Sequence, residues 1–459
     1  MTIAYPSYRP SKVEWLGALP EHWSVRRIKE TSYLKARVGW KGLTSDEFMD
    51  SGFAYLVTGT DFRAKFIDWS DCYCVDRDRY DDDPFIQLEN GDLLITKDGT
   101  IGKLAIVTKL EKPACLNSGI FVVRPIKAYI TSYLYWVLSS PNFTHFCDLG
   151  SYGSTIQHLY QNVFENFSFP IPPIKEQVAI AAFLDRETGK IDALVEDQKR
   201  LVELLKEKRQ AVISHSVTKG LNPNVPMKAS GVEWLGDVPE HWDVSPLMRL
   251  TADGRNIMYG IVLPGPNVDE GVPIVKGGDV RPHRLTLDLL NRTTAEIEAP
   301  FARARLRPKD IVYSIRGSIG DAELVPDELL DANITQDVAR VSPRPDLNCR
   351  WLLYALKSIA IFVQLEQRSL GAAVRGINIF DLKRARVPLP TPSEQDEIAT
   401  FLDRQTLTID GLLSEASSAI DLLTERRAAL ISAAVTGKID VRRLEEVELK
   451  LNAKEAAFA

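Results

Sequence analysis

The sequence repeats itself, and the length of the repeat limits what the chain can fold into. VEWLGALPEHWSV at residues 13–25 returns as VEWLGDVPEHWDV at residues 232–244, with ten of thirteen positions identical. Later blocks return at a constant offset of 218: EQVAIAAFLDRET at 176–188 matches EQDEIATFLDRQT at 394–406 at nine of thirteen positions. Solenoid and propeller repeats are only about 20–50 residues long. A domain-sized period therefore predicts two tandem copies of one unit, related by a pseudo-two-fold axis.

Each copy is predicted to contain a globular part followed by a long helix. DLLITKDGTIG at 92–102 matches DIVYSIRGSIG at 310–320, and both have the pattern of a strand that enters a glycine turn. Further along each copy, a Pro-rich stretch precedes a segment that contains no Pro up to Thr218 or Thr436. We expect an α+β chain in which two similar globular domains are separated by two long helices, paired as an antiparallel coiled coil with pseudo-two-fold symmetry.

Apolar residues along the two predicted helices recur at the three- and four-residue steps of a coiled-coil seam. We predict that these residues form the helix pairing or a partner interface: Ile191, Leu194, Leu201 and Leu205 in the first helix, and Ile409, Leu412 and Leu423 in the second. The alternative is that each stripe packs on its own globular domain. The length of the helices and the charges on their other faces favour mutual pairing.

The repeat also sets the predicted boundaries. They are a first globular domain at 1–174, a first helix at 175–219, a linker at 220–231, a second globular domain at 232–392, a second helix at 393–438 and a C-terminal tail at 439–459. The linker is rich in Pro and Asn, as expected of a connector. We expect the first VEWLG motif to lie beside the end of the second helix, as the linker brings the second motif to the end of the first helix.

Composition is that of a soluble globular protein, with 45% hydrophobic and 26% charged residues. The chain starts without an apolar signal segment and has no uncharged apolar run near the roughly 18 residues that span a bilayer, so we expect a cytoplasmic protein. The net charge of −6 does not favour nucleic-acid binding, which needs Lys and Arg for phosphate. A local basic cluster such as RARLRPK at 303–309 could still supply them, or could be a solvated surface.

Motifs for catalysis are missing from the sequence. It contains no complete P-loop, no GxSxG and no HExxH, and NPNV at 222–225 is not the NPPY-type tetrad of amino-methyltransferases. Cys72, Cys74, His145 and Cys147 are of zinc-ligand type, but ordinary buried thiols explain them better because the second copy has no ligands at the matching positions. We therefore predict a binding protein without a metal site rather than an enzyme.

The motifs together resemble one family. VEWLGxxPEHW, a GxIG turn in each copy and PxPxxxEQxxIAxFLD at the start of each long helix are similar to the specificity (S) subunit of Type I DNA restriction-modification systems. The resemblance implies two target recognition domains that bind double-stranded DNA, with helices that dock two methyltransferase subunits, and restriction subunits that join them. It also implies no catalytic residue and no cofactor in this chain, with S-adenosylmethionine, ATP and Mg²⁺ on the partner subunits.

The two copies diverge most at residues 26–90 and 245–308, which are candidate segments for base readers. The individual candidate DNA contacts lie outside these segments. We predict them in two matched loops: a glycine turn with Lys97, Thr100 and Lys103 matched by Arg316 and Ser318, and a polar loop with Ser154, Thr155, Gln157 and His158 matched by Arg375 and Asn378. Arg, Asn and Gln can make bidentate contacts with bases, whereas Lys, Ser and Thr suit phosphates. For each residue, an ordinary surface turn or local cap is the alternative.

The tryptophans of the repeated motif could be stacking platforms for bases or a hydrophobic clip. Trp15, Trp23, Trp234 and Trp242 belong to a motif that is nearly identical in two modules expected to read different DNA. We therefore favour the clip, which would seat each module against the helices or a partner subunit.

Two other functions stay open on the sequence. A coiled-coil adaptor that organises proteins without reading DNA would also need two modules and a rod. A methyltransferase with fused recognition domains is disfavoured because its motifs are missing.

Overall fold

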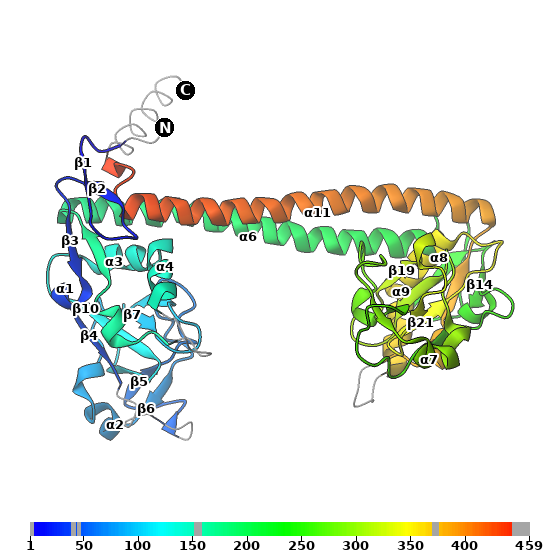
Figure 1. Ribbon diagram of the computed structural model, residues 1–459, viewed down its shortest axis with the longest axis horizontal. Helices are drawn as coiled ribbons and strands as arrows, with labels where there is room; N and C mark the ends of the chain where they lie inside the picture. Colours follow the sequence, from blue (N-terminus) through cyan, green and yellow to red (C-terminus); the bar gives the residue numbers. More distant parts are fainter. Residues whose placement is uncertain (1–3, 38–42, 44–46, 151–157, 370–375, 443–459) are drawn as a thin grey trace. The chain divides into compact units, whose positions relative to one another are not determined.

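The computed structural model describes residues 4–37, 43, 47–150, 158–369 and 376–442 of the 459-residue chain (Figure 1). It divides into two compact units, each of which takes part of both long helices. The first unit contains residues 1–198 and 418–459, and the second contains residues 199–417. Each unit therefore holds one globular domain, the start of one long helix and the end of the other.

A four-stranded sheet forms the centre of each globular domain, with the same strand order in both. In the first domain the order is β4 (Ser32–Ala36), β10 (Ile120–Pro125), β7 (Leu93–Thr96) and β8 (Leu104–Ile106). In the second it is β15 (Met258–Tyr259), β21 (Val338–Val341), β18 (Ile311–Ser314) and β19 (Ala322–Leu324). All neighbours in both sheets are antiparallel. The predicted strands before the glycine turns are β7 and β18, so this part of the prediction is confirmed.

A three-stranded sheet in each domain repeats a less common mixed topology. β5 (Ala54–Val57) pairs antiparallel with β6 (Tyr73–Val75) and parallel with β9 (Ala114–Leu116). β16 (Val272–Val275) pairs in the same way with β17 (Asn291–Thr293) and β20 (Asn333–Ile334). Most of these strands lie in residues 26–90 and 245–308, where the two copies diverge most, yet both domains have the same topology.

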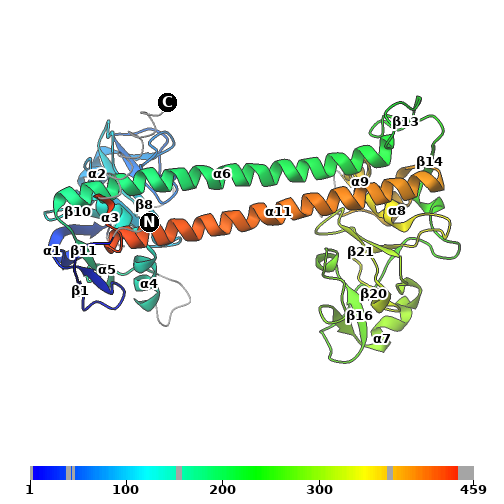
Figure 2. The same ribbon diagram turned by 90° about the horizontal axis from the view of Figure 1, so that it is seen from above.

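Short helices follow the last strand of the four-stranded sheet along the chain in each domain. They are α3 (Thr131–Leu138), α4 (Pro141–Gly150) and α5 (Gln161–Phe164) in the first domain, and α8 (Cys349–Leu356), α9 (Ile359–Ser369) and α10 (Ile379–Arg384) in the second. Within the second unit, α8 and α9 lie beside α11 while β16, β20 and α7 (Ala295–Glu298) lie on the far side of the sheet (Figure 2). The first domain has the same layers, with α2 (Arg77–Asp81) beside its distal sheet (Figure 1).

Small two-stranded ribbons join each domain to its helix. β1 (Tyr8–Pro10) pairs with β2 (Ala18–Pro20), and β3 (Ser24–Arg27) pairs with β11 (Ser168–Ile171). Their counterparts are β12 (Met227–Ala229) with β13 (Asp237–Pro239), and β14 (Asp243–Pro246) with β22 (Arg386–Leu389). The remaining short helices are α1 (Ile28–Thr31) and the 3-10 turns at 84–86, 247–249, 277–279, 299–304 and 327–329.

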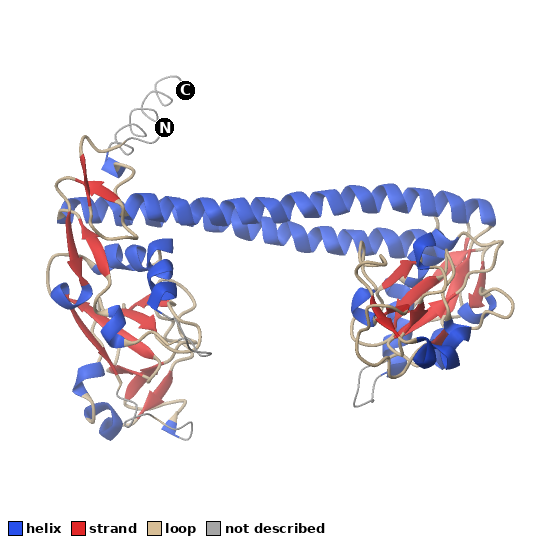
Figure 3. Cartoon of the chain, viewed as in Figure 1, coloured by secondary structure: helices blue, strands red, loops and turns tan. Residues whose placement is uncertain are grey.

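The long helices are α6 (Ile174–Lys219) and α11 (Pro392–Val435), the longest elements in the part of the chain that the structure describes (Figure 3). In the first unit, Arg427 of α11 donates to Asp192 of α6, with Nε and Oδ1 2.8 Å apart. In the second unit, Arg209 of α6 donates to Asp410 of α11 at 3.0 Å. In each unit the beginning of one helix lies beside the end of the other, which is the predicted antiparallel pairing.

The buried seam of the helices differs from the predicted one at three leucines. Ile191, Leu205 and Ile409 are buried as predicted and Leu423 is half-buried, but Leu194, Leu201 and Leu412 are 50%, 42% and 45% exposed. The seam instead takes the next residue in each case: Val195, Val202 and Leu413. A heptad seam that includes Ile191 and Leu205 advances by four and then three residues, so it passes through 195 and 202. The predicted seam was therefore one residue out of register at these three positions, where two neighbouring residues are both apolar.

Helix ends meet the repeated motif in both units. Tyr8 of β1 donates its hydroxyl hydrogen to the carbonyl of Gly437, which follows α11, at 2.9 Å. Gly437 has a φ of +68° and lies so close to Pro20 that an added Cβ would be 2.5 Å away. In the second unit Gly220, with a φ of +78°, follows α6 and lies against Trp242. The expectation that the first motif lies beside the end of the second helix is confirmed.

Candidate nucleic-acid interface

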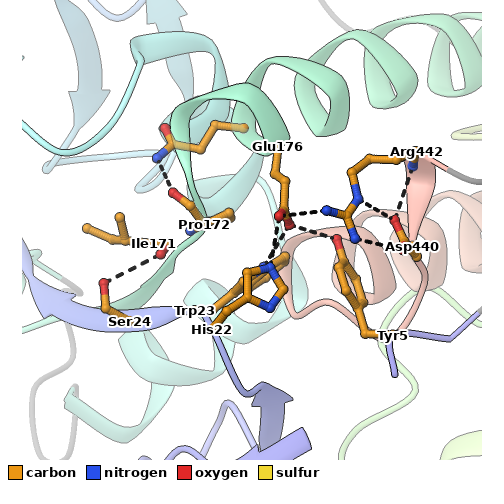
Figure 4. Close-up of polar contacts among 10 residues, drawn as sticks. Tyr5, His22, Trp23, Ser24, Ile171, Pro172, Glu176, Asp440 and Arg442 are labelled. Atoms are coloured by element: carbon orange, nitrogen blue, oxygen red, sulfur yellow. Dashed lines mark hydrogen bonds and ion pairs between the residues drawn. The ribbon is translucent and has the colours of Figure 1, made fainter. Parts of the chain in front are cut away.

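Two different repeated motifs, VEWLGxxPEHW and the EQ segment that opens the long helix, contact each other within each unit. In the first unit, Trp23 is 1% exposed and its Nε1 donates to Glu176 Oε2 at 3.0 Å (Figure 4). His22 Nε2 lies 2.8 Å from the other oxygen of this carboxylate. The PEHW and EQ segments are thus two halves of one junction, which explains why both are repeated.

The second unit repeats this junction with matching residues. Trp242 Nε1 donates to Glu394 Oε1 at 3.1 Å, and His241 Nε2 lies 2.9 Å from the same oxygen. Burial alone would raise the pKa of Glu394, but hydrogen bonds from His241, Thr391 and Trp242 outweigh it and hold the pKa below its ordinary value. The carboxylate is therefore charged and fixes the domain to the helix.

The first junction has two additional contacts, supplied by residues near the chain ends. Tyr5 donates to Glu176 Oε2 at 3.2 Å, and Arg442 Nη1 donates to Oε1 at 2.9 Å (Figure 4). Arg442 also binds Asp440, whose hydrogen bond raises the pKa of the guanidinium. Burial raises the pKa of the Tyr5 hydroxyl, which stays protonated. In the second unit the continuous linker occupies the corresponding part of the chain.

The other two tryptophans of the repeated motif are half-buried. Trp15 Nε1 donates to the carbonyl of Ser168 at 3.1 Å, and its ring stacks on Phe167 with centroids 6.0 Å apart. Trp234 Nε1 is buried and has no hydrogen-bond partner among the described residues. The structure thus places Trp23 and Trp242 against the long helices, and Trp15 against the domain's own β11 strand.

The two predicted loops of the first domain meet and form a groove. The backbone N–H of Leu159 donates to the carbonyl of Lys97 at 2.9 Å. His158 Nδ1 lies 2.7 Å from Asp98 Oδ1, and Lys97 Nζ lies 3.4 Å from the other oxygen of Asp98. The groove, a cavity of about 480 Å³, is lined from these two loops, from the end of β4 and from the start of α5.

The second domain has a groove at the equivalent place. Ile377 N–H donates to the carbonyl of Ile315 at 2.8 Å. This hydrogen bond is equivalent to the one between Leu159 and Lys97, at the offset of 218. Arg316 forms an isolated β-bridge with Gly376. This groove is again a cavity of about 480 Å³, lined by the glycine turn, by Tyr259 on β15 and by Asn378 before α10. The same backbone arrangement therefore presents different side chains in the two domains.

The remaining predicted contact residues are distributed unevenly. Thr100 is exposed on the turn, where its carbonyl accepts from Thr96 Oγ1 at 2.5 Å, and Ser318 Oγ accepts from Arg281 Nη2 at 3.4 Å. Lys103 is exposed but lines a different hollow, beside α3 and α6.

Asn378 caps α10, because its Oδ1 accepts from Phe380 N at 2.9 Å. The predicted residues Ser154, Thr155, Gln157 and Arg375 lie outside the described residues. No finding tests any of these residues as DNA contacts, so they stay predictions.

Several groove residues were missed on the sequence. Asp98, Arg37 and Tyr160 line the first groove, and Tyr259 and Gln336 line the second. Asp98 could have been found, because it lies in the glycine turn and matches Arg316 at the offset of 218. Arg37 directly follows β4 and Tyr259 lies on the equivalent strand β15, both in the most divergent region, where the repeat gives no alignment.

The cysteines considered as zinc ligands lie in different parts of the first domain. Cys72 belongs to the core of the distal sheet, whereas Cys147 on α4 packs on the core beside the long helices. Burial raises the pKa of each thiol to about 12, so neither is a ready thiolate ligand. Among the residues that the structure describes, no group of three or more His, Cys, Asp or Glu side chains could hold a metal ion.

The model of the type I restriction modification DNA specificity domain matches residues 20–204 and 270–414, which together make up well over half of the chain. The chain belongs to this family. Its match in two segments follows the internal repeat. The predicted identity as a type I specificity subunit is thereby confirmed.

Relatives of this specificity-subunit family cover most of the chain. It is 26% identical over 365 residues to the type I restriction enzyme EcoBI specificity subunit of Escherichia coli, covering 78% of this chain and 76% of the relative. It is 25% identical over 447 residues to the putative MjaX specificity subunit of Methanocaldococcus jannaschii, covering 93% and 96%. Nothing in these relatives supports the alternative of an adaptor without DNA readout.

Solved structures support the fold of this specificity subunit. A chain from a structure of the complex assembly and conformational transition of the type I R-M system matches with a TM-score of 0.69 and 18% identity, covering 91% of this chain and 98% of that one. The HsdS subunit from Thermoanaerobacter tengcongensis matches with a TM-score of 0.50 and 17% identity, covering 92% and 98%. The described helices include none long and apolar enough to cross a membrane.

Proposed function

We propose that this specificity subunit reads a split DNA site, with one half-site for each globular domain. The observation that carries the proposal is the duplicated groove. The two grooves share their backbone hydrogen bond and differ in their polar side chains. A conserved frame with exchanged side chains is what two readers of different base sequences need, because bases are recognised through side-chain donors and acceptors.

The long helices are proposed to set the distance between the half-sites and to dock two methyltransferase subunits. Leucines at equivalent positions stay exposed on both helices: Leu194 and Leu204 on α6 match Leu412 and Leu422 on α11. They lie outside the seam, so pairing of the helices does not explain them. Large exposed apolar side chains at repeated positions suit two copies of one partner.

The chain is proposed to be non-catalytic, with restriction subunits joining the methyltransferase subunits in the cell's cytoplasm. The methyl donor S-adenosylmethionine, ATP and Mg²⁺ would then be bound by these partners. The lack of P-loop and methyltransferase motifs in the sequence supports this division of labour. Partners could also supply part of the positive charge for phosphate, since this chain carries a net charge of −6.

Selection from a random pool of duplex DNA tests the function. The chain is purified together with its cognate methyltransferase subunits and the pool is bound at low salt, where phosphate contacts are strongest. We expect enrichment of duplexes that share a split motif. Failure to bind any duplex would overturn the proposal in favour of the adaptor, and S-adenosylmethionine binding by the chain alone would favour a fused methyltransferase.

A further inference from the structure

The two grooves differ most sharply at one pair of facing positions. On the glycine turn, the first domain has Asp98 where the second has Arg316. On the opposite wall, the first has His158 where the second has Gly376. The short side chain of Asp98 thus faces the imidazole of His158 in the first groove, and the long side chain of Arg316 faces Gly376 in the second. In each groove one position of the pair has a larger residue and the other a smaller one.

Gly376 gives Arg316 the room that it needs. A Cβ at position 376 would lie 3.3 Å from Arg316 Cγ, so a larger residue would crowd this side chain. In the first groove the shorter Asp98 leaves space for the imidazole of His158, which lies 2.7 Å from it. In each domain the size of the residue on the glycine turn therefore matches the space left by the residue on the opposite wall of the groove.

The guanidinium of Arg316 is open to a ligand. Its side chain is 50% exposed, and its ion pair with Asp337 is long, with Nη1 and Oδ1 4.0 Å apart, beyond hydrogen-bond distance. Tyr259 and Gln336 line the same groove. Arg281 lies beside the turn, where it donates to Ser318, so a second cation flanks the groove. An exposed Arg whose planar donors make no hydrogen bond to the described residues is the side chain that best recognises guanine, through O6 and N7.

Asp98 cannot make this contact with guanine, although Lys97 in the same groove carries donors. Asp98 is a carboxylate that accepts from His158 and lies beside Lys97, and it offers acceptors where Arg316 offers donors. O6 and N7 of guanine are themselves acceptors, so a carboxylate at this place would repel them. A carboxylate suits an exocyclic amino group instead. One exchanged residue therefore separates the preferences of the two domains.

Resting on the proposed function, we propose that Arg316 determines specificity by reading a guanine in the half-site of the second domain. Asp98 at the equivalent position of the first domain offers no donor for this contact. Arg316 then acts as a base reader, whereas Arg281 beside it contacts phosphate. The half-sites of the two domains differ at the base pair that this position faces.

The test maps methylated motifs in cells that express the methyltransferase with the wild-type chain, Arg316→Ala, Arg316→Lys or Arg249→Ala. Arg249 is exposed in the same domain, lies outside the groove and serves as the control. We expect Arg316→Ala to relax one guanine in one half-site by about 10- to 100-fold, with the other half and the gap unchanged. Arg316→Lys keeps the charge but loses the planar fork, so we expect partial relaxation.

The outcomes separate this inference from the function on which it rests. If the wild type yields no split motif, both the proposed function and the inference about Arg316 are wrong. If the wild type yields a split motif but Arg316→Ala leaves every guanine required, or lowers methylation evenly over all motifs, Arg316 is not a base reader. Asp98→Asn tests the equivalent position of the first domain. We expect it to alter only the half-site of the first domain, and an effect on the half-site that Arg316→Ala changes would overturn the assignment. Equal thermal melting of all variants shows that they fold.

Discussion

Glu176 and Glu394 show how a single residue ties the repeated motifs together. Each carboxylate accepts from the Trp and contacts the His of the PEHW motif in its own unit. The sequence indicated both motifs as framework, but it could not show that they contact each other. At the same scale, a residue just ahead of Glu394 caps the second long helix. The structure has Thr391 in this role, with its Oγ1 3.4 Å from Glu394 N and its N–H donating to Glu394 Oε2 at 3.1 Å.

Glu176→Gln should destabilise the chain more than Glu394→Gln. Glu176 is 6% exposed at its side chain and accepts from four residues, whereas Glu394 is 29% exposed and lacks the contacts of Tyr5 and Arg442. We expect Glu176→Gln to cost about 1–3 kcal/mol of the free energy of unfolding, because hydrogen bonds to a buried charge are lost. Thermal melts of the two matched variants measure this order, and an equal or larger loss in Glu394→Gln would contradict it.

Acid should weaken the second domain through Glu298. Its carboxylate is 1% exposed and accepts from Arg305 at 2.9 and 2.7 Å and from Asn333 at 2.8 Å. The hydrogen bonds from Arg305 hold the pKa of Glu298 below its ordinary value. A lowered carboxyl pKa stabilises the fold above the unfolded pKa of about 4.3, and this stability is lost as the pH falls through the folded pKa.

Urea unfolding between pH 5 and pH 3 measures this loss. The wild type should lose more stability over this range than Glu298→Gln, which has no carboxyl group to protonate. Parallel pH profiles of the two proteins would show that Glu298 contributes nothing to the acid sensitivity.

At the scale of elements, the repeat predicted the long helices well and their register poorly. Their start after the Pro-rich stretch and their antiparallel pairing follow from proline-free heptads. The choice between Leu194 and Val195 depends on which face meets the partner helix, and both residues are apolar. Two faces of the helix carry leucines, one for the seam and one left exposed. The sequence alone cannot show which of the two faces packs against the other long helix when a partner subunit is also expected to bind.

Truncations on the two faces of α11 should separate their roles. Ile409 is 3% exposed in the seam, so Ile409→Ala should cost about 2–4 kcal/mol of stability. Leu412 is 45% exposed, so Leu412→Ala should cost less than about 1 kcal/mol in the isolated chain. On the proposed function it should instead weaken binding of the methyltransferase subunit, measured by titration calorimetry. A larger stability loss in Leu412→Ala than in Ile409→Ala would contradict the observed seam.

A cavity beside α4 of the first domain predicts a stabilising substitution. The cavity of about 200 Å³ is lined by Gly102, Phe143 and Thr144. In the second domain the residue that matches Thr144 is Phe362, whose ring packs against Gly320 so closely that a Cβ there would lie 3.1 Å from it. We expect Thr144→Phe to add about 0.5–2 kcal/mol of stability by filling the space.

The reverse change, Phe362→Thr, is the matched control and should cost about 1–3 kcal/mol because it opens the corresponding space. Thermal denaturation of both variants gives the comparison. A lower melting temperature for Thr144→Phe would show that the two sites are not equivalent in packing.

For the whole molecule, the sequence predicted the duplicated architecture because the framework motifs repeat and the repeat is domain-sized. It also gave candidate contact residues in the glycine turn and in the loop before α5, and the structure brings these two loops together, although most of the residues predicted in that loop lie outside the described part of the chain. It did not predict Arg37 or Tyr259 in the grooves, because their strand lies where the two copies have diverged. Residues that read different DNA must diverge, so the repeat is least informative where recognition is expected.

The central claim is that two domains on paired helices read two different half-sites separated by DNA that neither domain reads. Sequencing the methylated bases in cells that express this chain with its methyltransferase tests the claim most directly. The account predicts a split motif with two different halves and a gap of constant length. A continuous motif, or two halves separated by a gap of variable length, would contradict it.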